Sequence, residues 1–101
     1  MKILLVCNAG MSTSMLVQRM EKAAKEKSLE LEVIALPLLQ AEKILNEWDV
    51  VMLGPQVRHC KAKLEQASTG TPIEVIDMRD YGMMNGQAVL EKAIDIIEKN
   101  K

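Results

Sequence analysis

Two repeating patterns of hydrophobic and polar residues alternate along the chain, and together they predict four strands separated by helices. Residues 2–6 and 49–53 are almost entirely apolar, which is typical of parallel strands buried on both faces. Residues 29–35 and 73–77 instead alternate apolar with polar side chains, as expected for strands with one wetter face. The first pair should therefore lie inside a sheet and the second pair at its edges.

Between these strands, apolar residues recur at helical spacing. This pattern predicts helices over residues 11–27, 40–48, 57–67 and 86–99. The segment 79–85 is polar and flanked by glycine, and we interpret it as an irregular connection. Strand and helix thus alternate four times, which predicts a parallel sheet with helices on both faces.

The predicted fold class is α/β, with residues 1–101 forming one three-layer domain around a four-stranded sheet of order 2-1-3-4. Right-handed crossovers place the first helix on one face of this sheet and the next helices on the other. A crevice should then open beyond the carboxyl ends of the two central strands. The loops that reach this crevice are residues 7–14 and 54–56.

The first of these loops has the composition of an anion site. It begins with Cys7, and the residues that follow are Asn8, Ala9, Gly10, Met11, Ser12, Thr13 and Ser14. A tight turn at Gly10 in front of a new helix aims backbone N–H groups and the positive end of the helix dipole at one point. Such a position can lower the pKa of a cysteine from about 8.5 to between about 3.5 and 7.5.

We therefore hypothesise that Cys7 is a nucleophile that carries a phosphoryl group. The hydroxyls of Ser12, Thr13 and Ser14 would cap the helix or donate hydrogen bonds to phosphate oxygens. The competing interpretation is a small buried cysteine at a strand end, followed by ordinary helix caps.

Composition excludes several other function classes. A formal net charge of −1, with only Trp48 and Tyr81 able to stack on bases, argues against nucleic-acid binding. One histidine and two distant cysteines give no credible metal-ligand set, so we expect no metal. No stretch approaches the about 18 to 20 apolar residues that span a bilayer, and Met1 leads straight into a strand, so we expect a reduced cytoplasmic protein without direct membrane insertion.

Known loop motifs narrow the chemistry further. The chain lacks both the Walker pattern and the GxGxxG pattern, which argues against a nucleotide cofactor; we expect no cofactor at all. A tyrosine-phosphatase-like loop would place an arginine six residues after the cysteine to clamp phosphate, and Thr13 occupies that position. A small cysteine phosphatase or arsenate-reductase-like enzyme, with Arg58 or Arg79 reaching in, is therefore the second hypothesis. A non-catalytic anion-binding regulatory module is the third.

Three segments carry a resemblance to a known family. They are the run from Cys7 to Val17, Leu53-Gly54-Pro55-Gln56, and Val75-Ile76-Asp77 followed by Tyr81-Gly82. The chain resembles, over essentially its whole length, the type-3 enzyme IIB components of the bacterial sugar phosphotransferase system, lactose/cellobiose class. The fold implied is similar to that of low-molecular-weight tyrosine phosphatases.

The resemblance implies a protein-phosphocysteine sugar phosphotransferase. A phosphohistidine on a IIA protein would pass its phosphoryl group to Cys7, and Cys7 would pass it to a sugar bound in the membrane-embedded IIC transporter. We expect a monomer that reaches the membrane only through IIC, with a cellobiose- or chitobiose-type sugar as acceptor.

Residues outside the loop have less defined roles. Gln56 either donates to the phosphate or braces the loop, and Tyr81 either borders the site or packs. Asp77 and Asp80 are interpreted as capping groups, with a general acid as the alternative. Met11, Met83 and Met84 lie near the loop in this interpretation, and each is either exposed and in contact with a partner protein or buried.

Overall fold

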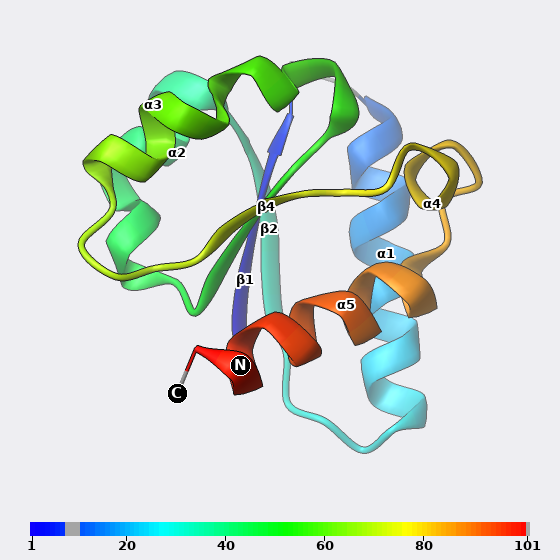
Figure 1. The fold of residues 1–101 in the computed structure, drawn as a ribbon. Helices are drawn as coiled ribbons and strands as arrows, with labels where there is room; N and C mark the ends of the chain where they lie inside the picture. The colour runs from blue at the N-terminus through cyan, green and yellow to red at the C-terminus, as the bar shows by residue number, and fades with distance from the viewer. Residues whose placement is uncertain (8–10, 101) are drawn as a thin grey trace.

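The computed structural model describes residues 1–7 and 11–100, and the side chains of all of these except residues 11–13. Four parallel strands form one sheet in the order β2-β1-β3-β4, as the sequence predicts (Figure 1). Their bounds are Lys2–Cys7 for β1, Glu32–Pro37 for β2, Val50–Leu53 for β3 and Ile73–Val75 for β4. The two apolar strands are central and the two alternating strands are edges.

The register brings the carboxyl ends of the strands to one edge of the sheet. Val6 pairs with Leu36 of β2 on one side and with Leu53 of β3 on the other, and Leu53 pairs with Val75 of β4. Loops that follow these strands therefore start side by side. This arrangement places the residue after Val6, which is Cys7, at the middle of the edge.

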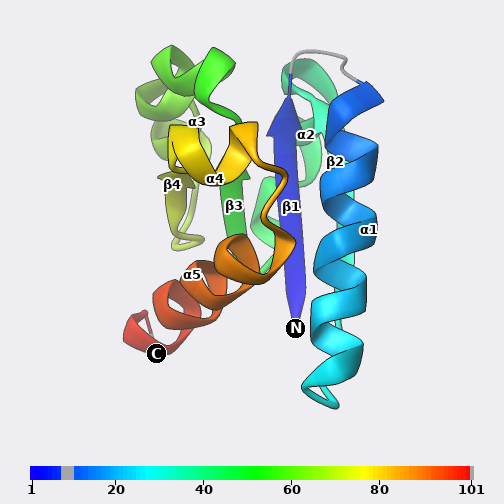
Figure 2. The same cartoon turned by 90° about the vertical axis from the view of Figure 1, so that its right-hand side faces the viewer.

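Helices cover both faces of the sheet (Figures 1 and 2). Helices α1 (Met11–Glu26) and α5 (Gly86–Lys99) pack together on one face, and α2 (Leu38–Ile44) and α3 (Lys61–Ala67) cover the other. The sheet and its two helical layers give the three-layer α/β architecture that the sequence predicts.

Each central strand contributes to two separate cores. Ile3 and Leu5 of β1 belong to the cluster beneath α1 and α5, whereas Leu4 and Val6 belong to the cluster beneath α2 and α3. All four side chains are at most 1% exposed. Successive side chains of a strand point to opposite faces, so burial on both sides requires an unbroken apolar run. Trp48 is 7% exposed and belongs to the second cluster.

The helix predicted over 57–67 is split in two. A 3-10 helix, η2, covers Pro55–Cys60, and α3 begins only at Lys61. Val57 breaks the α-helical geometry with φ −118° and ψ 21°. Val57 therefore marks a kink within η2, and both Val57 and Cys60 are buried in the second cluster. Similarly, the predicted helix 40–48 starts earlier, at Leu38, and ends as a 3-10 turn, η1 (Leu45–Glu47).

The strand predicted from residue 29 begins only at Glu32, because the preceding residues close α1. Ser28 has a left-handed φ of 56°, and the N–H of Leu29 donates to the carbonyl of Ala24 at 2.9 Å. The N–H of Ser28 donates to Lys25 at 3.1 Å, which completes a Schellman cap. Leu29 therefore belongs to the end of a helix rather than to the strand.

The segment 79–85, predicted as irregular, contains a short helix, α4 (Met78–Gly82). Its N-cap is Asp77, which also explains why β4 ends at Val75 instead of continuing to residue 77. A five-residue helix is too short to show an apolar stripe, so periodicity did not detect it. Within the described part of the chain, no helix is long and apolar enough to span a membrane.

Candidate functional site

Cys7 is the last residue of the central strand β1 and lies at the middle of the carboxyl edge of the sheet. It is 5% exposed. Helix α1 begins four residues later, at Met11, on the face shared with α5. The strand and the helix therefore follow one another as the sequence predicts, and the first turn of α1 starts close in sequence to the sulfur.

Much of the predicted phosphate loop lies outside the described residues. This applies to Asn8, Ala9 and Gly10, and to the side chains of Met11, Ser12 and Thr13. Ser14, the last loop residue, lies in the first turn of α1 with an exposed side chain.

The loop after β3 is tied to the strand that bears Cys7. The N–H of Gly54 donates to the carbonyl of Val6 at 2.9 Å, and the carbonyl of Gly54 accepts from the N–H of Val57 at 3.0 Å. The first bond extends the pairing of β1 with β3 beyond Leu53, to Gly54. The Gly54-Pro55-Gln56 turn thus starts beside Cys7, which agrees with the predicted crevice.

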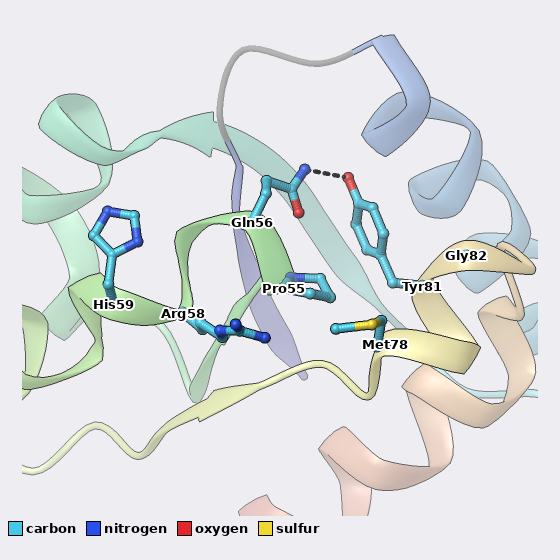
Figure 3. Close-up of a pocket in the computed structure, with 7 residues that line it drawn as sticks. All are labelled: Pro55, Gln56, Arg58, His59, Met78, Tyr81 and Gly82. Carbon is cyan, nitrogen blue, oxygen red and sulfur yellow. Dashed lines mark hydrogen bonds between the residues drawn. The ribbon is translucent and has the colours of Figure 1, made fainter.

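Gln56 and Tyr81, the two predicted flanking residues, contact each other. Nε2 of Gln56 donates to the hydroxyl oxygen of Tyr81 at 2.9 Å (Figure 3). A Cβ atom on Gly54 would lie 2.7 Å from Oε1 of Gln56 and 3.5 Å from Cε1 of Tyr81. A side chain at position 54 would therefore require the end of the Gln56 side chain to shift.

Asp77 acts as the N-cap of the helix that carries Tyr81. Its Oδ1 atom accepts from the backbone N–H groups of Arg79 at 2.8 Å and Asp80 at 3.2 Å. This is the capping role that we expected, and it engages the same carboxylate that the alternative would use as a general acid. The backbone carbonyl of Asp80 accepts from Asn85 at 2.9 Å and helps to close the turn after α4.

An open cleft of about 610 Å³ lies between η2 and α4 (Figure 3). It is lined by Pro55, Gln56, Arg58, His59, Met78, Tyr81 and Gly82. Arg58 gives one wall of this cleft a positive charge, and Tyr81 supplies an amphipathic wall opposite. Arg79, the other candidate arginine, is not among the described residues that line the cleft.

The structure assigns Cys60 a packing position. It is 8% exposed and belongs to the cluster beneath α2 and α3, on the opposite face from α1. Within residues 1–7 and 11–100, no group of three or more histidine, cysteine, aspartate or glutamate side chains is arranged to hold a metal ion.

Met83 and Met84 differ in exposure. Met83 is 65% exposed, as expected of a residue that contacts a partner, but Met84 is partly buried against the core beneath α1 and α5. Met78 and Met15 were not singled out from sequence, yet they are 64% and 49% exposed. Met78 lines the cleft because α4, undetected from sequence, places it there. The sequence does indicate this helix through Asp77, a residue type favoured at the N-cap, and through Asp80, an acidic residue in the first turn.

Comparison with known proteins places this geometry in a family. Residues 2–92 match the family "PTS system, Lactose/Cellobiose specific IIB subunit". The galactose-specific EIIB component of Lactococcus lactis subsp. cremoris is 40% identical, and the cellobiose-specific EIIB component of Lactococcus lactis subsp. lactis is 39% identical; each match covers 94% of both chains.

Solved structures agree with this assignment. The solution structure of the cellobiose-specific phosphotransferase IIB component from Borrelia burgdorferi is 47% identical, with a TM-score of 0.82 over 100% of this chain and 94% of that one. The lactose-specific IIB domain from Streptococcus pneumoniae shares the fold with a TM-score of 0.84 at 16% identity, over 94% of this chain and 95% of that one. The chain therefore belongs to the lactose/cellobiose-specific IIB family of the phosphoenolpyruvate:carbohydrate phosphotransferase system.

Proposed function

We propose that this IIB component carries a phosphoryl group on Cys7 between two other proteins. It accepts the group from a phosphohistidine of a IIA protein and transfers it to a sugar bound by a membrane-embedded IIC transporter. The observation that carries the proposal is the position of Cys7 at the end of the central strand, with α1 beginning four residues later. Unpaired N–H groups and the positive end of a helix dipole favour an anion in that position.

The transfer consists of two displacements at phosphorus. In the first, the Cys7 thiolate attacks phosphorus, the S–P bond forms, and the N–P bond breaks with its electron pair returning to the imidazole nitrogen. In the second, a sugar hydroxyl oxygen attacks phosphorus, the S–P bond breaks, and Cys7 leaves as a thiolate. The hydroxyl proton goes to a base on the transporter side, and no nucleotide is consumed.

Two features favour a carrier over a hydrolase. Thr13 occupies the loop position where phosphatases of similar fold need an arginine clamp. Asp77 is engaged at the N-terminus of α4 through two backbone N–H groups, so its carboxylate already serves as a cap. A phosphoryl group on Cys7 would then persist until an acceptor binds.

We propose a β-linked sugar such as cellobiose or chitobiose as acceptor. Relatives are named for galactose, cellobiose and oligo-β-mannoside. These relatives are named for different sugars, yet their sequence identities to this chain are nearly equal. The choice of sugar therefore belongs mainly to the transporter.

The test is to incubate the protein with IIA that carries a labelled phosphoryl group and to identify the residue that receives it. We expect one phosphoryl group that withstands acid, which hydrolyses phosphohistidine, and is released by iodine, which attacks the S–P bond. Cys7→Ser should abolish this label. Cys60→Ser is the matched control, because the two cysteines are similarly buried, at 5% and 8% exposed.

Three results would contradict the proposal. A label that remains on folded Cys7→Ser would place the phosphoryl group elsewhere. Rapid release of inorganic phosphate, with turnover of p-nitrophenyl phosphate, would indicate a cysteine phosphatase. Full transport function in Cys7→Ser, together with retained phosphate binding, would indicate an anion-binding regulatory module.

A further inference from the structure

Helix α4 carries Tyr81, yet the hydrophobic core hardly holds it. None of its five residues is buried, and Tyr81 only packs partly buried against the cluster beneath α1 and α5. The position of α4 therefore depends in part on polar contacts with other elements. At the N-terminal end, Asp77 caps the helix through Arg79 and Asp80 of α4 itself and makes no such contact with any other described element.

Arg19 supplies a polar contact from another helix at the C-terminal end of α4. This residue lies on α1, and its Nη1 atom donates to the backbone carbonyls of Met83 at 3.2 Å and Met84 at 3.1 Å. These carbonyls follow the last turn of α4, where a helix leaves acceptors without partners of its own. A guanidinium donates charge-assisted bonds, which are stronger than those between neutral groups.

The turn that Arg19 holds has an unfavourable backbone conformation. Met84 has a φ of 52°, in the left-handed region that residues with a Cβ atom rarely adopt. Its carbonyl accepts both Arg19 Nη1 and the N–H of Gly86, the latter at 3.0 Å. A strained turn persists only where its surroundings hold it, so the bonds from Arg19 stabilise a conformation that the chain would not choose alone.

The backbone of α1 contacts the same turn. Gly86, the first residue of α5, is buried so closely against α1 that a Cβ atom would lie 2.5 Å from the carbonyl carbon of Arg19 and 2.6 Å from the nitrogen of Met20. The side chain of Arg19 thus contacts the turn at Met83 and Met84, and the backbone of Arg19 contacts it at Gly86. Arg19 therefore couples α1 to the α4–α5 turn.

We propose that Arg19 is a positioning residue for phosphoryl transfer. It holds the α4–α5 turn against α1 and thereby keeps Tyr81 in place to accept the hydrogen bond from Gln56 at the carboxyl edge of the sheet. This inference rests on the proposed role of Cys7. Arg19 lies eight residues after the start of α1, about two turns away, so it acts through α4 and does not touch the phosphoryl group.

The test compares Arg19→Met with Lys22→Met. Both variants remove one positive charge from α1 at a residue that lines the same cleft beside residues 83–87. Among the described residues, the side chain of Lys22 has no hydrogen-bond or ion-pair partner, so this variant controls for charge. We expect Arg19→Met to slow transfer from phosphorylated IIA to Cys7 several-fold, as Tyr81→Phe should, because both variants disturb the same Gln56–Tyr81 bond and misplacing a site group slows transfer. Lys22→Met should stay within about twofold of wild type.

A second measurement reports on the hydrogen bond itself. The side-chain amide resonance of Gln56 should move in Arg19→Met toward its position in Tyr81→Phe, and should not move in Lys22→Met. Arg19→Lys, which keeps a cationic donor, should restore part of both the rate and the resonance position. Combining Arg19→Met with Tyr81→Phe should slow transfer no further than the slower single variant.

The outcomes separate the two proposals. A wild-type protein that takes no label on Cys7 overturns the proposed function and, with it, the role of Arg19 in transfer. A labelled wild type with an unimpaired Arg19→Met overturns the positioning role alone. Slow transfer with an unchanged Gln56 resonance, or additive effects in the double variant, also overturns it, because Arg19 would then act by another route.

Discussion

The hydroxyl of Tyr81 accepts a 2.9 Å hydrogen bond from Nε2 of Gln56, which joins η2 to α4 across the carboxyl edge of the sheet (Figure 3). The two residues are 25 positions apart, and each lies in an element that follows a different strand. The loop after β3 and the helix after β4 are therefore connected beside the strand that ends in Cys7.

We expect Tyr81→Phe to slow phosphoryl transfer several-fold while leaving the fold almost unchanged. The variant keeps the ring, which packs partly buried, and removes the acceptor of the Gln56 bond. Because Gln56 is exposed, its amide can turn to water, and the free energy of unfolding should fall by less than about 1 kcal/mol. Transfer kinetics with phosphorylated IIA and urea unfolding check the two parts. Transfer at the wild-type rate would show that the bond serves only to brace the loop.

Two substitutions of Asp77 distinguish its role as a helix cap from a role as a general acid. Asp77→Ala removes the acceptor for Arg79 and Asp80 and should lower the free energy of unfolding by about 1 kcal/mol. Asp77→Asn keeps a side-chain oxygen and should preserve both stability and transfer. A large loss of transfer in stable Asp77→Asn would instead support the general-acid role.

Gly86→Ala should destabilise the protein by about 2 kcal/mol, typical of overpacking. The added Cβ would meet the backbone of α1 at 2.5 Å, so the two helices must separate. Gly82→Ala is the control, because among the described residues no atom outside its own helix and its chain neighbours lies within 4 Å of a Cβ placed there, and its stability should change by less than about 1 kcal/mol. Thermal and urea unfolding of the two variants provide the comparison; equal stabilities would show that α1 and α5 adjust freely.

The contribution of Glu91 to stability should depend on pH. Its carboxylate accepts from Gln87 Nε2 at 3.2 Å and lies 3.4 Å from Lys27 Nζ; these two partners lower the pKa of Glu91 below its ordinary value. A carboxyl whose pKa is lower in the folded state adds stability above its unfolded pKa, about 4.3, and loses it as the pH falls through the folded value.

Glu91→Gln should therefore be slightly less stable than wild type at pH 7 and indistinguishable from it at pH 3. The difference should stay small because the side chain is exposed, and it should shrink in high salt. Urea unfolding at both pH values measures it. Glu98→Gln, which removes one carboxylate from the same helix and leaves the contacts of Glu91 with Gln87 and Lys27 intact, is the control. In Glu91→Gln, a difference at pH 7 that persists at pH 3 would exclude the charge as its cause.

The sheet could be predicted from sequence because strand burial leaves a direct pattern. Ile3 to Val6 are buried on both faces and apolar without interruption, whereas the alternating residues of β2 and β4 mark edges, and this contrast gives the strand order. The positions of Cys7 and of the turn at Gly54 could be predicted from that strand order. Their place at the carboxyl edge is a consequence of topology rather than of a motif.

The wall formed by α4 could not be predicted in the same way. Its position comes from contacts between distant residues: Gln56 with Tyr81, and Arg19 with Met83 and Met84. Periodicity describes one segment at a time and says nothing of such pairs. The left-handed φ of Met84 is likewise imposed by its surroundings, since methionine gives no local signal for it.

The strand that ends in Cys7 is held from both sides, through Cys7 opposite Pro37 and Val6 opposite Leu53, and buried above and below. The Cys7 sulfur is therefore attached to a rigid part of the backbone, and no flexible segment can carry it from one partner protein to the other. In the carrier role, the protein that delivers phosphorus and the transporter that removes it must visit the same spot in turn, so an excess of either one should slow delivery to the other.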